Sequence, residues 1–114
     1  MMVLIVDDEV DLRDILREAF QDEGFAVEVA CDGAEAMQRL ARPPKPIAVI
    51  LDIAMPIMDG NQVWSAMQRD PELAGVPVIV TTSDPSRAPR NVPVVRKPLD
   101  LDALIDRVKA LQSA

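Results

Sequence analysis

The sequence predicts an α/β domain with a doubly wound, five-stranded parallel sheet and helices on both faces. Short apolar runs alternate along the chain with amphipathic segments of helical period. The run at residues 47–52 is apolar without alternation until it ends at Asp52, which is typical of a central strand covered on both faces. The connections are short, and crossovers between parallel strands are right-handed, so few topologies remain.

Length and composition fit one domain that folds alone. The 114 residues, taken as a single domain spanning 1–114, suffice for one core, and 49% hydrophobic with 27% charged residues is ordinary for a globular chain. Lys plus Arg number 12 against 19 Asp plus Glu, which gives a formal charge of -7. A negative molecule repels nucleic acid and anionic membranes, so we expect neither as a direct partner.

The sequence lacks the residues of several kinds of site. Its first residues have no basic region and too short an apolar run for a signal peptide or membrane span, which predicts a cytoplasmic protein. The single cysteine, Cys31, excludes an internal disulfide, and we interpret it as structural. The absence of histidine excludes Ser-His-Asp hydrolysis, His-ligated zinc and a phosphohistidine on this chain. Carboxylate chemistry remains.

The first half of the sequence predicts three strands and two helices. An apolar strand at residues 2–6 ends at Asp7 and Asp8. The helix that follows starts at Asp11 and ends near Gly24, with an apolar stripe of Leu12, Ile15, Leu16, Ala19 and Phe20. Residues 25–30 alternate loosely as a strand. A short helix with Ala34, Met37 and Leu40 then precedes a proline cluster and the strand at residues 47–52.

The second half of the sequence predicts two more strands and at least two helices. A helix at residues 61–69 is closed by Asp70-Pro71, and its Trp64 suits the core or a groove lining. The strand at residues 76–81 leads to Thr82 and Ser83, and a brief strand at residues 92–96 leads to Lys97. Asp100 is a good N-cap for a final helix. The apolar face of that helix is Leu101, Leu104, Ile105, Val108 and Leu111.

The strand order that we expect is 2-1-3-4-5, the flavodoxin-like order. In such a sheet the switch point lies between the first and third strands, and ligands bind outside the carboxyl ends of the strands there. Asp7 and Asp8 end the first strand and Asp52 ends the third. Topology therefore predicts an acidic cluster at this edge, although Asp52 alone is equally compatible with a capping role in the following turn.

A cluster of three carboxylates favours a hard divalent cation. Carboxylates a few ångströms apart in a partly desolvated cleft disfavour being charged together. Mg²⁺ prefers oxygen ligands and commonly bridges carboxylates to a phosphate, which suits Asp7, Asp8 and Asp52. Lys97 can add a fixed positive charge and Thr82 a hydroxyl hydrogen bond. Taken singly, Lys97 also reads as a surface lysine and Thr82 as an ordinary strand-end residue, but together the five residues predict a phosphoryl site with Asp52 as nucleophile.

The motifs in this sequence resemble those of receiver domains from bacterial two-component response regulators, and the resemblance covers nearly the whole chain. The motifs are VLIVDDE at 3–9, ILDIAMPIMDG at 50–60, PVIVTT at 77–82 and RKP at 96–98. The resemblance implies that Asp52 is the phosphoacceptor and that Asp8, Asp52 and the backbone carbonyl of Ala54 ligate Mg²⁺, with Asp7 acting largely through water. It implies that Thr82 supplies the hydroxyl and Lys97 binds the phosphate.

The same resemblance implies a signalling role. The phosphodonor would be a sensor histidine kinase or a histidine phosphotransfer protein, and phosphorylation would change the binding of an output partner that the sequence does not name. The chain would be a regulatory phosphoacceptor rather than an enzyme, since it would catalyse only its own phosphorylation and dephosphorylation.

The sequence departs from the family pattern after Thr82. The connection at residues 83–96 is short, and Pro89 and Pro93 would break a helix, so we expect the fourth crossover helix to be absent or about one turn long. Val94 stands where the family usually has a switching aromatic residue. We therefore expect the loop at residues 83–92 to carry most of the response. Ala54 cannot orient an attacking water whereas Asp84 can, so the phosphoryl lifetime stays open.

Two alternatives remain. A magnesium-dependent phosphohydrolase of the haloacid dehalogenase kind also uses a strand-end Asp nucleophile, but it needs an acid two residues later, where Ala54 supplies none. A receiver-like interaction module that acts without phosphorylation would explain the short crossover and the missing aromatic. It would leave the retention of the five site residues unexplained.

Overall fold

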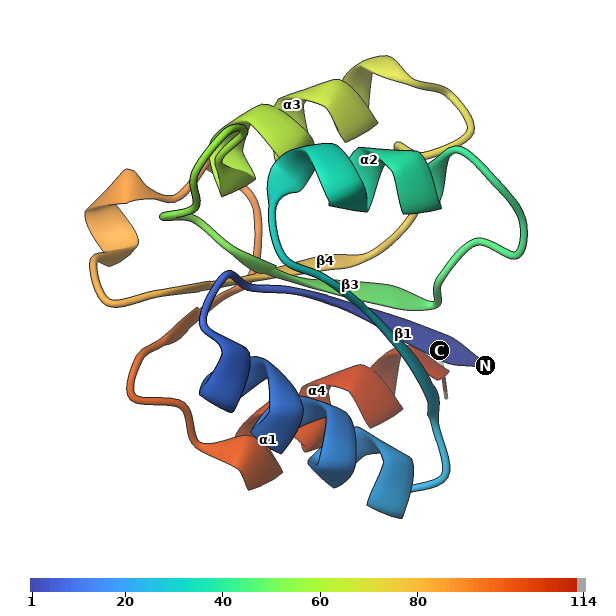
Figure 1. The fold of residues 1–114 in the computed structure, drawn as a ribbon, viewed down its shortest axis with the longest axis vertical. Coiled ribbons are helices and arrows are strands. Elements are labelled where there is room, and N and C mark those ends of the chain that lie inside the picture. Colours follow the sequence, from blue (N-terminus) through green and yellow to red (C-terminus); the bar gives the residue numbers. More distant parts are fainter. Residues whose placement is uncertain (113–114) are drawn as a thin grey trace.

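A computed structural model describes residues 1–112 and confirms the predicted sheet (Figure 1). Its strands are all parallel and lie in the order β2-β1-β3-β4-β5. They are β1 (Met2–Val6), β2 (Ala26–Ala30), β3 (Ala48–Asp52), β4 (Val78–Thr82) and β5 (Val94–Arg96). The carboxyl ends of β1 and β3 are therefore neighbours, as a switch point requires.

The helices form one layer on each face of the sheet (Figure 1). α1 (Val10–Asp22) and α4 (Leu101–Gln112) cover one face, and α2 (Gly33–Leu40) and α3 (Gly60–Arg69) cover the other. Because side chains alternate along a strand, Val3 and Ile5 of β1 pack under α1 and α4 whereas Leu4 and Val6 pack under α2 and α3. None of the helices within residues 1–112 has the length and apolar character needed to cross a bilayer.

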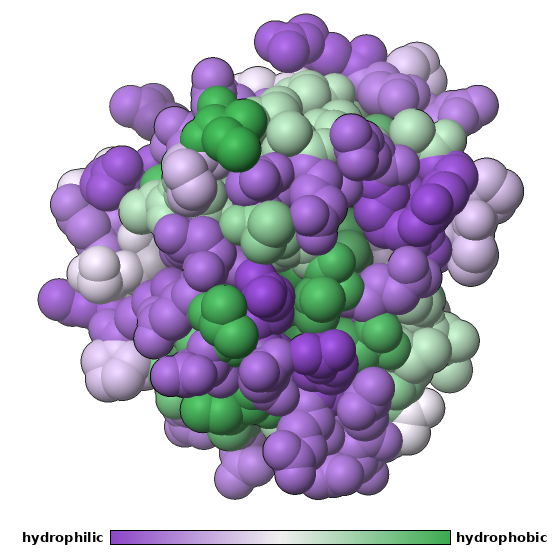
Figure 2. Space-filling model, viewed as in Figure 1, coloured by the Kyte–Doolittle hydropathy of each residue, from purple (hydrophilic) through white to green (hydrophobic). Residues whose placement is uncertain are grey.

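The molecular surface is mostly hydrophilic. In Figure 2 apolar side chains reach the surface mainly along the middle of the molecule, between the two helical layers. Within the sheet, the central strands β1, β3 and β4 are buried throughout. The edge strands β2 and β5 are largely half-buried. Continuous apolar runs therefore mark the central strands, as the sequence predicts.

The helix ends agree with the local sequence signals. Asp59 caps α3 in a capping box, since its side chain accepts from the amide of Gln62 while the Gln62 side chain accepts from the Asp59 amide, both at 2.9 Å. Asp100 accepts from the amide of Ala103 at 3.1 Å and so acts as the predicted N-cap of α4. Gly24 follows α1 with a φ of 92°, a conformation that glycine adopts without strain.

The bounds of two predicted strands and the predicted burial of Leu111 differ from the structure. β4 starts at Val78 and β5 at Val94, later than predicted, because Pro77 and Pro93 have no amide hydrogen and only their carbonyls join the sheet. β4 also extends one residue further than predicted, so Thr82 is its last residue. Leu111, expected on the buried face of the last helix, is 40% exposed and lines a hollow beside Pro77 and Pro93.

The fourth crossover is a single 3-10 turn, η1 (Pro85–Arg87), which confirms the predicted loss of a helix. Asp84 caps this turn by accepting from the amide of Ser86 at 3.1 Å and from its hydroxyl at 2.6 Å. These hydrogen bonds lower the pKa of Asp84. Asn61 of α3 donates from Nδ2 to the carbonyl of Arg87 at 2.8 Å, so the turn is tied to the neighbouring helix.

Candidate functional site

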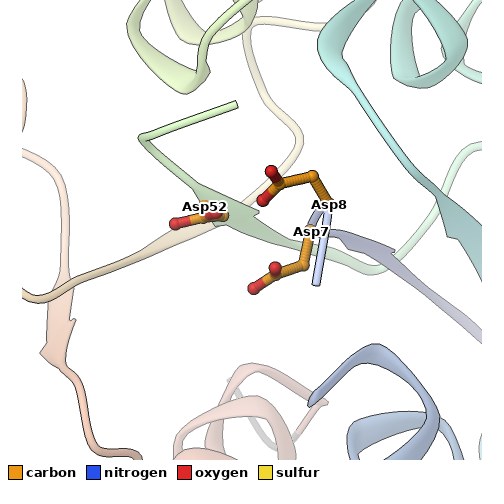
Figure 3. A group of neighbouring side chains, drawn as sticks. All are labelled: Asp7, Asp8 and Asp52. Carbon is orange, nitrogen blue, oxygen red and sulfur yellow. The ribbon is translucent and has the colours of Figure 1, made fainter. Parts of the chain in front are cut away.

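The predicted acidic cluster is present at the carboxyl ends of β1 and β3. Asp7, Asp8 and Asp52 each offer a carboxylate oxygen, and these oxygens all lie within 4.8 Å of one another (Figure 3). Asp7 and Asp52 are 2% and 5% exposed, whereas Asp8 is open to solvent. The cluster thus joins two desolvated carboxylates to one that faces water.

Backbone contacts fix both buried carboxylates. The amide of Asp7 donates to the carbonyl of Ala30 at 3.1 Å, and its Oδ1 accepts from the amide of Glu9 at 2.9 Å. Asp52 is the last residue of β3 and pairs in register with Thr81. Gly60 lies so close that a Cβ there would be 2.2 Å from the carbonyl oxygen of Asp52. Only glycine therefore lets α3 start against the end of this strand.

Lys97 places a positive charge between the two buried carboxylates. Its Nζ donates to Oδ2 of Asp7 and to Oδ1 of Asp52, both at 3.2 Å. The Lys97 amide donates to the carbonyl of Thr82 at 2.8 Å, directly after β5, which fixes where the side chain starts. The lysine thus reaches from the sheet edge across β4 to β1 and β3.

The charges in the cluster shift its protonation equilibria. Burial, followed by repulsion from Asp7, raises the pKa of Asp52 to about 6, and the attraction of Lys97 offsets this only in part. Burial alone would lower the pKa of Lys97. The attraction of the Asp52 and Asp7 carboxylates is larger than this effect, so the pKa of Lys97 is raised. Lys97 therefore stays charged at neutral pH.

Thr82 ends β4, the strand next to β3, and its hydroxyl bonds within its own loop. Thr82 Oγ1 donates to the carbonyl of Asp84 at 3.2 Å and accepts from the Asp84 amide at 3.1 Å. Thr82 is 5% exposed, so this hydroxyl is satisfied by its own loop. Ala54, the remaining predicted ligand, is exposed in the connection that follows β3.

Several residues near the site were not predicted. Arg13 of α1 donates from Nη1 to the carbonyl of Asp7 at 3.0 Å, although its place on the polar face of the predicted helix gave no signal of this. Gly60 and Asn61 had a partial signal, because the Asp59-Gly60 pair marks a helix start. Cys31 is exposed rather than packed, and the hydrogen bond from its Sγ to Glu35 raises the pKa of the thiol.

The donor set fits a magnesium ion. All the ligand atoms are oxygens, they converge within 4.8 Å, and one of the three carboxylates faces solvent, where water can complete the coordination. Burial and the repulsion between Asp52 and Asp7 raise the pKa of Asp52 even with Lys97 present, so the ionised cluster favours additional positive charge. A divalent cation would supply that charge.

Comparisons with known proteins agree with this geometry. The family model for the response regulator receiver domain matches residues 3–109. Response regulator MprA of Mycobacterium leprae (strain TN) is 33% identical over 97% of this chain and 50% of its own length. The chain therefore spans about half the length of the curated relatives that it matches.

Solved structures give the same result. The receiver domain of a signal transduction histidine kinase from Syntrophus aciditrophicus superposes with a TM-score of 0.88 and 29% identity, over 98% of this chain and 89% of that one. Response regulator TrrA from Thermotoga maritima, solved in complex with Mg²⁺-BeF, superposes with a TM-score of 0.85 and 29% identity, over 96% of this chain and 97% of that one. With the matched model, the shared strand order and the acidic strand ends, this chain belongs to the response regulator receiver domain family, the phosphoacceptors of two-component signal transduction.

Proposed function

We propose that residues 1–114 act as one receiver domain in which Asp52 accepts a phosphoryl group from a phosphohistidine. The observation that carries the proposal is the position of Asp52. Its carboxylate is buried at the end of β3, lies 3.2 Å from Lys97 Nζ, and shares a 4.8 Å cluster with Asp7 and Asp8. These 114 residues contain no histidine, so the phosphohistidine lies outside them, and we expect it on a sensor histidine kinase or a histidine phosphotransfer protein.

The transfer forms one bond and breaks one. A lone pair on an Asp52 carboxylate oxygen forms the O–P bond while the N–P bond of phosphohistidine breaks, and its electron pair stays on the imidazole nitrogen. Burial leaves the Asp52 carboxylate poorly hydrated and therefore reactive. Lys97 remains protonated and can follow the charge from the carboxylate to the phosphoryl oxygens, because its Nζ already contacts Asp52.

Asp7, Asp8, Asp52 and the backbone carbonyl of Ala54 are the groups that we expect to hold Mg²⁺, Asp7 largely through water. The ion would neutralise charge on the transferring phosphoryl oxygens. The TrrA structure is a complex with Mg²⁺-BeF, which supports Mg²⁺ as the ion by family likeness.

Thr82 and its loop carry the response in this proposal. To donate to a phosphoryl oxygen, the Thr82 hydroxyl must leave the Asp84 carbonyl, and that movement loosens the start of η1. Val94 has no aromatic ring that could move together with Thr82. We therefore expect the loop at residues 83–92 to respond most, and amide exchange with and without beryllofluoride would disprove this if the loop stayed unchanged while another surface responded.

The output of this change is a difference in partner binding. We place the protein in the cytoplasm as a regulatory phosphoacceptor, with catalysis limited to its own phosphorylation and dephosphorylation.

The test is intact mass after incubation with Mg²⁺ and acetyl phosphate. Wild type should gain one acid-labile phosphoryl group, and chelation of Mg²⁺ or Asp52→Asn should abolish it. Asp59→Asn is the matched control, because it removes a nearby half-buried carboxylate while Asn keeps the N-cap of α3. Labelling of Asp52→Asn to the wild-type level would contradict the proposal.

An interaction module without phosphorylation is the second candidate. The single 3-10 turn in place of a helix, and Val94 in place of an aromatic ring, are the observations that favour it. In that case the folded protein would bind Mg²⁺ without gaining a phosphoryl group or releasing phosphate. Phosphate release without a detectable adduct would instead indicate rapid hydrolysis of the phosphoryl group.

A further inference from the structure

Ile57, in the connection from β3 to α3, combines two features that seldom occur together. Its φ is 69°, in the left-handed region, and its side chain is 81% exposed. A positive φ is a genuine outlier for a β-branched residue, because its branched Cβ crowds the backbone. Burial in the core does not compensate for this strain, since the side chain points to solvent.

A tight turn imposes the conformation on Ile57. The amide of Met58 donates to the carbonyl of Pro56 at 2.7 Å, which makes Ile57 the central residue of a γ-turn with positive φ, a rare and strained form. The chain on either side is held, because the Met58 carbonyl accepts from Gly33 at 3.0 Å and the Ile53 carbonyl accepts from Gly60 at 2.9 Å. These hydrogen bonds anchor the loop to the starts of α2 and α3, which limits how far Ile57 can relax.

The strained turn lies next to the phosphoryl site. Ile57 is five residues after Asp52, in the loop that starts where β3 ends. The other large apolar side chains exposed near this edge are Val10, 54% exposed at the start of α1, and Ile15, 51% exposed one turn later. They follow the Asp7-Asp8 pair. Exposed apolar side chains thus follow both strands, β1 and β3, whose ends carry the carboxylates of the site.

We propose that Ile57 is an apolar contact for the protein that donates the phosphoryl group, an inference that rests on the proposed function. The phosphohistidine must approach Asp52 within bonding distance, so the donor surface around it must cover the loops that frame the site. Burying Ile57 against that surface would explain why a β-branched residue occupies this turn, where Gly or Asn would relieve the strain. A small phosphodonor makes no such contact.

The test compares donors that carry an N–P bond with and without a protein surface. Wild type, Ile57→Gly and Ile57→Asn are labelled by phosphoramidate and by a phosphorylated histidine kinase dimerisation domain, chosen from a panel because it labels wild type fastest. Phosphoramidate should label all three within twofold. The kinase domain should label both variants at least tenfold more slowly, and Ile57→Leu should recover part of the rate.

Two further measurements exclude a merely structural effect. Both variants should unfold at higher denaturant concentration than wild type, since they relieve the turn. Leu111→Asn, which removes an exposed apolar side chain from the last turn of α4, should leave both labelling rates unchanged.

The outcomes separate the two proposals. The proposed contact would be overturned if the kinase domain labelled wild type and Ile57→Gly at equal rates. It would also be overturned if phosphoramidate labelled wild type but no kinase domain of the panel did. Failure of phosphoramidate to label wild-type Asp52 would instead overturn the proposed function.

Discussion

Lys97 holds together two buried carboxylates that would otherwise repel each other. Its Nζ lies 3.2 Å from Asp7 and 3.2 Å from Asp52, so it competes with any cation for the same oxygens. The same ammonium group is the only one in the cluster that can follow charge onto a phosphoryl group. Affinity for metal and rate of phosphorylation should therefore respond in opposite directions when this lysine is removed.

Lys97→Met tests this opposition. Loss of a hydrogen bond to a charged group costs about 1.5–3 kcal/mol, so phosphorylation by acetyl phosphate should slow by at least about tenfold. Mg²⁺ should bind more tightly by calorimetry, because one positive charge leaves the site. Lys45→Met, which removes a lysine bonded to the Leu40 carbonyl, should change neither quantity. Weaker Mg²⁺ binding by Lys97→Met would contradict this account.

The raised pKa of Asp52 predicts a pH-dependent stability. A carboxyl whose pKa is about 6 when folded and 3.8 when unfolded binds protons more tightly in the folded state. Its contribution to stability is fully present below pH 3.8 and is lost as pH rises through 6. Without metal, wild type should therefore lose about 1 kcal/mol of unfolding free energy relative to Asp52→Asn when the pH rises from 5 to 7.5.

Denaturant melts in EDTA at the two pH values measure this gain, with Asp59→Asn as the control. A constant difference between Asp52→Asn and wild type would show that Asp52 is not destabilised by its surroundings.

At the scale of elements, the missing crossover helix leaves η1 with few anchors. Thr82, Asp84 and Ser86 bond within the loop, and Asn61 supplies a tie to α3 through the Arg87 carbonyl. The loop is thus connected at one end to the phosphoryl site and along its turn to the neighbouring helix. This makes it suited to carry a local change at Thr82 to the surface.

Asn61→Ala should loosen this loop without unfolding the protein. An exposed hydrogen bond contributes about 0.5–1.5 kcal/mol, so global stability should fall by no more than that. Amide exchange at residues 84–92 should rise several-fold, whereas the central strands should be unchanged. Gln68→Ala, on an exposed position of the same helix, is the control and should not alter the loop. Unchanged exchange in Asn61→Ala would show that the tie does not hold η1.

The connection from α2 to β3 depends on one buried arginine. Arg39 is 6% exposed, and its guanidinium donates to both carboxylate oxygens of Glu28 and to the carbonyls of Arg42 and Pro44. Arg39→Met should lower the free energy of unfolding by about 1–3 kcal/mol, because it leaves these acceptors without their donor. Arg42→Met removes a side chain that is 69% exposed and 4.0 Å from Glu28, so its cost should stay below about 0.5 kcal/mol. Equal losses from the two variants would contradict the assigned role.

At the scale of the whole molecule, the fold and the acidic cluster follow from pattern. Continuous apolar runs identify the buried strands, and each run that ends in Asp places a carboxylate at the same sheet edge. Pro89 and Pro93 likewise predict the loss of a helix. These features are local in sequence or follow from topology.

The remaining features depend on contacts between distant segments. The reach of Lys97 to Asp7 spans 90 residues, and the Arg13 contact joins a helix surface to a strand end, so neither follows from periodicity. The Thr82 hydroxyl could face Asp52 or its own loop, and only the geometry shows its bonds to Asp84. The strain at Ile57 arises from a turn held between α2 and α3, which no local propensity reveals.

The central claim is that Asp52 is the residue that receives the phosphoryl group, and site mapping tests it most directly. Borohydride reduces an acyl phosphate to an alcohol, so a phosphorylated aspartate becomes homoserine and can be located by tandem mass spectrometry. After treatment with Mg²⁺ and acetyl phosphate, homoserine should appear at position 52 alone and vanish when Mg²⁺ is chelated. Homoserine at Asp7, Asp8 or Asp59 with none at position 52 would contradict the account.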